Sequence, residues 1–352
     1  MSHSRKTMVI ASIGAITVLA IGILTIPHPP ALSTVTSGNA ELIARVRHLL
    51  DEEPGVRDRV SVAVIDGTTV REAHFGATEN TEYEIGSVTK TMTAALFVDA
   101  IERGEIAPDA RLGELVDLGT SQAASVTLEE LATHSSGLPR LAPSAKQLYS
   151  AIVANLRASD PYGSSIEELL ANARDTQLGE KGFSYSNFGF ALLGQALAAA
   201  AGEDYSSLLA ERMFKPLGMD SSFAPVSTQD LAEDAPTGYT ASGRSSDPWT
   251  LGGDAPAGSV RSNLADMVRY VIAQRDRTAP GNAATDPRAT AGEGQGIGYA
   301  WITSDDITWH NGGTGGFTSW VGFDRESGRA VVVLNNTAAS VDDVGIALVE
   351  DS

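Results

Sequence analysis

The sequence predicts an α+β protein in which a five-stranded antiparallel sheet carries the two terminal helices, with a mostly helical domain inserted between its strands. Two strand-like runs near the start, Val60–Ile65 and Val70–Phe75, flank Asp66-Gly67, a dipeptide typical of hairpin turns. Three more strand-like runs come late in the chain, at 306–310, 319–324 and 330–335, with only hairpin-length connections between neighbours. Parallel neighbours would need longer crossovers, so we expect an antiparallel sheet.

The other segments are assigned around this sheet. We expect an export signal at 1–26, a linker at 27–40, the sheet domain at 41–112 and 256–352, and the helical domain at 113–255. Apolar residues at helical spacing predict helices at 41–50, 87–103, 127–134, 144–157, 165–173, 187–201, 205–214 and 341–349. The Gly- and Ala-rich stretch 278–298 is expected to be a mobile loop. It leads into a strand-like run and not into a helix, which excludes a dinucleotide-binding fingerprint.

Composition excludes several classes of function. The 352 residues carry a net charge of −19, and Arg5 and Lys6 are the only charged residues before Glu41, so the remainder carries −21. A body this acidic repels nucleic acid. The chain has no cysteine, which excludes disulfides and thiolate chemistry, and its six histidines include no metal-binding spacing. We therefore expect neither a metal nor a cofactor.

The start of the chain predicts export. Arg5 and Lys6 precede Met8–Ile26, nineteen residues without a charge. As a helix this segment would span about 28 Å, roughly the hydrocarbon core of a bilayer. A positive flank keeps the N-terminus inside and sends the remainder outward. We expect either an uncleaved membrane anchor, which places the body on the extracellular face, or a cleaved signal peptide and a secreted protein.

A serine and a lysine three residues apart, Ser87 and Lys90, open the helix expected at 87–103. On one helical turn their side chains share a face, so the amine can take the proton of the hydroxyl and activate it as a nucleophile. Unpaired N–H groups at the helix start favour the negative charge that develops during attack. By itself this pattern is common, and Ser87 as an N-cap with an exposed Lys90 is the simpler interpretation.

Two further motifs change that interpretation. Tyr185 and Asn187 lie two apart in an extended stretch and can face one cavity, where a phenol beside an ammonium acts as a general base and an amide holds substrate. His310, Gly312 and Gly313 follow a late strand. The glycines let the backbone approach a ligand, the N–H groups of Gly313 and Ser87 can form an oxyanion hole, and His310 offers a hydrogen bond or partial positive charge.

In this order, Ser-x-x-Lys, Tyr-x-Asn and His-x-Gly resemble the serine β-lactamase and penicillin-binding-protein superfamily. The resemblance runs from about 41 to 350 and is strongest to the branch of class C β-lactamases, D-alanyl-D-alanine carboxypeptidases and related esterases. Framework segments also resemble this branch, at 85–90, 131–139, 214–219 and 257–260. The resemblance implies a β-lactamase/transpeptidase-like fold.

The resemblance also implies a role for each site residue. Ser87 would be acylated, with Lys90 as proton acceptor and Tyr185 as general base and then acid. Asn187 would position substrate, and His310 stands where β-lactamases of this branch carry Lys. A neutral His lacks the permanent charge of Lys, so a carboxypeptidase-like or esterase-like activity is favoured over efficient β-lactam hydrolysis.

The expected function is therefore that of an exported serine hydrolase that forms an acyl-enzyme at Ser87 with a peptide amide, an ester or a β-lactam. Its partner would be a small molecule or a cell-wall peptide. Two alternatives use the same residues: an acyltransferase, and a penicillin-binding or sensor module without turnover. The sequence does not predict the oligomeric state.

Overall fold

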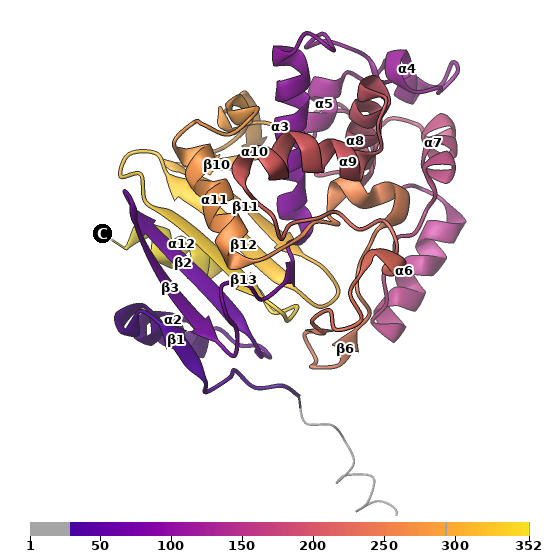
Figure 1. Cartoon of the computed structure of the whole chain (residues 1–352). Helices are drawn as coiled ribbons and strands as arrows, with labels where there is room; N and C mark the ends of the chain where they lie inside the picture. Colours follow the sequence, from indigo (N-terminus) through magenta and orange to yellow (C-terminus); the bar gives the residue numbers. More distant parts are fainter. Residues whose placement is uncertain (1–28, 293, 352) are drawn as a thin grey trace, which may run out of the picture.

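The protein, described here by a computed structural model for residues 29–292 and 294–351, is built on one large antiparallel sheet with helices on both faces (Figure 1). Among the described residues the sheet has nine strands in the order β1-β3-β2-β13-β12-β11-β10-β9-β8, and every neighbouring pair is antiparallel. The strands are β1 Thr36–Gly38, β2 Val60–Asp66, β3 Thr69–Phe75, β8 Ala289–Gly292, β9 Gln295–Ile297, β10 Ile302–Ser304, β11 Ile307–Gly313, β12 Thr318–Asp324 and β13 Ala330–Asn335.

The five predicted strands are confirmed as the contiguous centre of this sheet, and the predicted fold class is correct. Four short strands extend it. The stretch predicted as a mobile loop contains β8 and β9, which pair with each other and through β10 with β11. The last residues of the predicted linker form β1 on the outer side of β3. Both segments are strands because a neighbouring strand offers them hydrogen bonds, which local composition does not reveal.

All the predicted helices are present, with three additions, two of which have four residues or fewer. They are α2 Ala40–Glu52, α3 Thr89–Glu102, α4 Leu112–Leu115, α5 Leu128–Ala132, α6 Ala145–Arg157, α7 Ile166–Asp175, α8 Asn187–Ala201, α9 Tyr205–Leu209, α10 Lys215–Leu217, α11 Leu264–Arg275 and α12 Asp342–Glu350. A π-helical turn, Ala210–Phe214, joins α9 to α10, and a 3-10 segment, η5 Gly252–Ala257, packs on α8. Helix α11 was not predicted.

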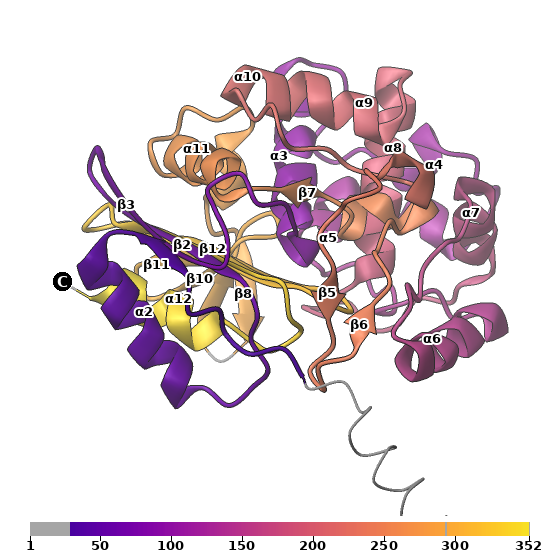
Figure 2. The ribbon, with the colours of Figure 1, turned by 60° about the horizontal axis from the view of Figure 1, so that its bottom comes forward.

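The sheet separates two hydrophobic cores. On β13, Val331 and Val333 face a core shared with the terminal helices α2 and α12, whereas Val332 and Leu334 face the larger core. This alternation follows from the two-residue period of a strand. The run of buried residues in β13 is uninterrupted because both faces of the strand are covered. Figure 2 shows α2 and α12 on one side of the sheet and α11 with the helical region on the other.

Within residues 29–292 and 294–351 no helix combines the length and the apolar character needed to cross a bilayer. The predicted export signal or anchor at 1–26 lies outside the described residues, so it stays a prediction.

Candidate active site

Ser87 lies in a 3-10 turn, η1 Gly86–Val88, that runs directly into α3. Gly86 has a left-handed φ of +51°, and a side chain there would come within 2.6 Å of the backbone nitrogen of Gly313. Ser319 Oγ donates a hydrogen bond of 2.8 Å to the carbonyl of Ile85. These contacts hold the Ser87 turn against the ends of β11 and β12, which only a residue without Cβ permits.

Lys90 is fully buried one turn further along, and its Nζ donates to Ser87 Oγ at 3.1 Å and to the carbonyl of Ala257 at 2.5 Å. Burial lowers the pKa of Lys90 well below its usual range, and the nearby Arg140 charge lowers it further. The lowered pKa favours the uncharged amine, whose lone pair can accept the Ser87 proton.

Tyr185 lies next to this pair. The Lys90 Nζ and the Arg140 guanidinium carbon are each 5.0 Å from its ring centre. Burial raises the pKa of Tyr185 to about 12, against the opposing effects of a hydrogen bond with Ser87 and of Arg140. The prediction that a neighbouring ammonium favours the phenolate is therefore wrong. Desolvation lowers the pKa of the lysine as well, and Tyr185 remains a phenol with a proton to donate.

The position of Tyr185 is fixed by the start of α8. Ser186 is the N-cap of that helix, and its Oγ accepts from the Gly189 N–H at 2.8 Å and donates to the Pro139 carbonyl at 2.7 Å. The Ser186 N–H donates to Nδ1 of His134 at 3.0 Å, and the His134 ring lies 4.5 Å from that of Tyr185. His134 belongs to a framework segment in the sequence, but nothing there indicated that it supports the phenol.

His310 is also close to Tyr185, with the two ring centres 6.4 Å apart, and only 4% of His310 is exposed. Its Nδ1 donates to the Asn311 carbonyl at 2.5 Å. Burial is the main cause that lowers the pKa of His310 to about 3, and Lys90 acts in the same direction only when it is protonated. The expected partial positive charge near neutral pH is therefore wrong, and His310 offers only a neutral imidazole.

Gly312 and Gly313 end β11 beside the Ser87 turn. An added Cβ at Gly312 would overlap the Ile85 carbonyl, whereas at Gly313 it would meet no atom within 4 Å. Gly312 is thus required for the close approach of β11 to η1, and Gly313 is free to present its backbone to a ligand.

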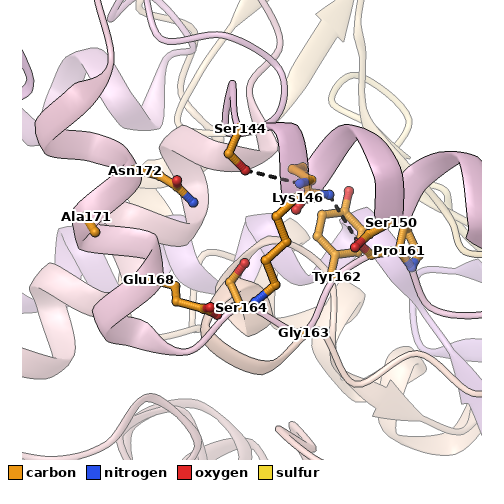
Figure 3. Close-up of a pocket in the computed structure, with 11 residues that line it drawn as sticks. Ser144, Lys146, Ser150, Pro161, Tyr162, Gly163, Ser164, Glu168, Ala171 and Asn172 are labelled. Atoms are coloured by element: carbon orange, nitrogen blue, oxygen red, sulfur yellow. Dashed lines mark hydrogen bonds and ion pairs between the residues drawn. The ribbon is translucent and has the colours of Figure 1, made fainter.

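Asn187 forms its side-chain hydrogen bond with a residue outside the predicted set. Its Nδ2 donates to the hydroxyl of Tyr162 at 2.7 Å, and its buried Oδ1 has no hydrogen-bond partner within the described part of the chain. Tyr162 also lines a separate cavity of about 180 Å³ between α6 and α7 (Figure 3). No motif in the sequence indicated that Tyr162 holds Asn187.

Ser87, Tyr185, Gly312 and Gly313 line one open cavity of about 430 Å³. Lys90 and His310 are buried next to it, while Asn187 is not among its lining residues. Two charged residues that the sequence did not single out complete the walls. They are Arg140, which directly follows a framework segment, and Asp342 at the start of α12.

A hydroxyl is bonded to a buried amine of lowered pKa, with a phenol beside it and free backbone at the rim, which is the set of groups that an activated serine nucleophile requires. The Beta-lactamase family model matches residues 44–350, so the chain belongs to the β-lactamase family. The predicted resemblance is confirmed.

Relatives agree with this assignment. The chain is 25% identical over 339 residues to unguisins hydrolase ungD' of Aspergillus campestris, a match that covers 82% of this chain and 60% of the relative. It is 30% identical over 184 residues to the D-alanyl-D-alanine-carboxypeptidase/endopeptidase AmpH of Escherichia coli, covering 48% and 46%. The match thus spans about half the length of these curated relatives.

Solved structures share the fold. A class C β-lactamase from Rhodobacter sphaeroides matches 84% of this chain and 94% of its own, with a TM-score of 0.70 and 22% identity. The octameric penicillin-binding protein homologue from Pyrococcus abyssi matches 85% of this chain and 74% of its own, with a TM-score of 0.70 and 24% identity.

Proposed function

We propose that the protein is an exported hydrolase that cleaves a peptide amide or an ester through an acyl-enzyme at Ser87. The observation that carries this proposal is the 3.1 Å contact between Ser87 Oγ and the Nζ of a fully buried lysine. A lysine exposed on a protein surface stays protonated at neutral pH and cannot act as a base, whereas burial lowers the pKa of Lys90.

The proposed reaction uses the protonation states of the site. Ser87 Oγ attacks the carbonyl carbon and passes its proton to Lys90, and the N–H groups of Ser87 and Gly313 hold the oxyanion, each worth about 2.7–4 kcal/mol in other enzymes. As the intermediate collapses, Tyr185 gives its proton to the leaving group and recovers one from Lys90. A water then attacks the ester, losing a proton to Lys90, and Ser87 leaves with a proton restored.

Two observations support a carboxypeptidase-like or esterase-like activity over efficient β-lactam hydrolysis. One relative carries the name of a D-alanyl-D-alanine-carboxypeptidase/endopeptidase and another that of a hydrolase. The low pKa of His310, about 3, leaves no permanent charge at the position where β-lactamases of this branch use Lys. An outward-facing body held by residues 8–26 would meet cell-wall peptides as substrates.

A fluorescent fluorophosphonate tests the nucleophile. We expect wild type to be labelled, Ser87→Ala to be unlabelled, and Lys90→Ala to be labelled at least about 100-fold more slowly. A folded wild type that takes up no label would contradict the proposal. Release of D-alanine from a D-alanyl-D-alanine peptide, compared with hydrolysis of a nitrophenyl ester, then separates the two substrate classes.

The same assay separates the two alternative functions. Transfer of the acyl group to an added alcohol or amine, in excess over hydrolysis, would indicate an acyltransferase. Stoichiometric labelling by a fluorescent penicillin without turnover of any substrate would indicate a binding or sensor module.

A further inference from the structure

Helix α6 presents an apolar face to solvent. Leu148, Tyr149, Ile152 and Leu156 are exposed to 66%, 69%, 54% and 70%. Their spacing puts them on one side of the helix, and the opposite side holds the buried Gln147 and Ala154. Among the described residues nine large apolar side chains are exposed, and these four are the only such group on a single helix. We call them the α6 stripe.

The charges of α6 differ from those of the body. The helix carries Lys146 near its first turn and Arg157 at its last residue, and no acid, although residues 41–352 have a net charge of −21. Lys146 Nζ bonds to Glu168 of α7 at 2.5 Å, and Figure 3 shows the two side chains close together. An apolar face with an aromatic residue and basic ends is typical of helices that lie in the headgroup region of a bilayer.

The described chain begins next to this helix. Gly243 packs so closely on Pro29 that an added Cβ would come within 2.6 Å of the proline ring. The neighbouring Arg244 donates to the carbonyls of Leu156 and Asn155 at 2.9 and 3.3 Å, which ties that segment to the last turn of α6. Figures 1 and 2 both draw the start of the chain on the side of the molecule where α6 lies. Residues 8–26, the predicted anchor, precede Pro29 directly.

We propose that the α6 stripe lies in the surface of the bilayer that residues 8–26 anchor. This rests on the proposed membrane anchoring of the chain. The anchor would hold α6 close to the bilayer, which raises the effective concentration of α6 at the lipid surface. Four apolar side chains are then enough to keep α6 bound there, despite the negative charge of the body. Arg157 can extend toward headgroups from the last turn of the helix.

Such contact would set the orientation of the active site. The inner side of α6 reaches the site through Gln147 Nε2, which donates to the Pro161 carbonyl at 3.2 Å, and through the adjacent Tyr162, which accepts from Asn187. These bonds connect α6 to the start of α8, directly after Tyr185, which does line the cavity. With α6 on the lipid, the cavity would be held at a fixed height above the membrane.

The chain has no cysteine, so a single introduced one can be labelled cleanly. We would place an environment-sensitive nitrobenzoxadiazole dye at Ile152→Cys, and as a matched control at Glu114→Cys on exposed α4, which lies away from α6 in Figures 1 and 2. The full chain is reconstituted into vesicles of phosphatidylethanolamine and phosphatidylglycerol, with and without spin-labelled lipid. Fluorophosphonate labelling verifies that each variant is folded.

We expect the dye at position 152 to be blue-shifted and quenched by spin-labelled lipid at every protein density, and the dye at 114 to be unaffected. A chain that floats with the vesicles while the dye at 152 is no more quenched than that at 114 would overturn the α6 proposal and leave the anchor standing. A blue shift that needs high protein density and resists quenching would overturn it in favour of a second copy. A chain that does not float would overturn both anchor and stripe, with hydrolysis unaffected.

Discussion

Lys90, Tyr185 and His310 lie close together, and burial shifts each of them toward its uncharged form. Their identities were predicted from the sequence, because the motifs have recognisable spacing. Their protonation states were not. Sequence spacing indicates that a phenol lies near an amine, but it does not reveal that Lys90 is fully buried, and burial outweighs the attraction between unlike charges here.

The imidazole of His310 provides a test of this point. Because its pKa is about 3, His310 is already neutral throughout pH 5 to 8. We expect His310→Gln to lower kcat/KM by a constant factor over that range and to leave the shape of the pH profile unchanged. The measurement is kcat/KM for a substrate with a carboxylate, at half-unit steps of pH. A change in kcat/KM near pH 6.5 that occurs in wild type and not in the variant would contradict the conclusion that His310 is neutral.

At the scale of elements, the approach of β11 to the Ser87 turn decides whether the oxyanion donors can converge. Gly312→Ala places a methyl group against the Ile85 carbonyl, so β11 must move away from η1. We expect kcat/KM to fall by about 100-fold or more, the size of losing one oxyanion donor. Gly313→Ala is the matched control, since the space beside it is open and its N–H is retained.

The two variants are compared by kcat/KM and by thermal unfolding. We expect Gly313→Ala to stay within a few-fold of wild type, a change of less than about 1 kcal/mol. Equal losses in both variants would show that the substrate needs the open space at 313 and that the separation of β11 from η1 is not what limits the rate.

The contact between Tyr162 and Asn187 links the segment after α6 to the helix that carries the active-site motif. Tyr162→Phe removes the acceptor for Asn187 Nδ2, and a hydrogen bond of this kind contributes about 0.5–1.5 kcal/mol. If Asn187 positions substrate, kcat/KM falls about 2- to 10-fold, mainly through KM. Tyr149→Phe, an exposed change on α6, is expected to leave kinetics with a soluble substrate unchanged. If Tyr162→Phe and wild type have identical kinetics, the hydrogen bond between Asn187 and Tyr162 does not contribute to substrate binding or catalysis.

Periodicity predicted the elements with a clear polar and apolar side, such as α2 and α6, nearly to the residue. It missed α11, where eight residues are buried, although Asn263 caps its start through a hydrogen bond from the Asp266 N–H. It also missed β8 and β9, whose Ala- and Gly-rich sequences are held as strands by pairing partners. These are cases in which distant parts of the chain decide the local structure.

For the whole molecule, the site forms where the large sheet meets the helical region. Ser87 comes from the segment between them, Tyr185 from the start of α8 and Gly313 from β11. The motifs predicted that these three segments converge, but not the walls around them. Arg140 and Asp342 line the cavity because of how the two regions pack, and no local pattern marks either residue.

A buried lysine with a lowered pKa makes the stability of the whole protein depend on pH. An unfolded lysine titrates near 10.5, whereas the pKa of Lys90 in the folded protein is well below that value. Between the two values the unfolded chain binds one more proton, so the contribution of Lys90 to folding improves as pH rises. Lys90→Met has a side chain of similar length that does not titrate, and it lacks this dependence.

We therefore expect the stability of wild type relative to Lys90→Met to increase by up to about 1.4 kcal/mol per pH unit as pH rises toward 10.5. Urea unfolding of both proteins at pH 7, 8 and 9, taken as a difference at each pH, cancels the titration of all other groups and the constant loss of the bond to Ala257. A difference that does not change with pH would mean that Lys90 is protonated in the folded protein. In that case the amine could not be the resting base for Ser87, and the proposed order of proton transfers would have to begin at Tyr185.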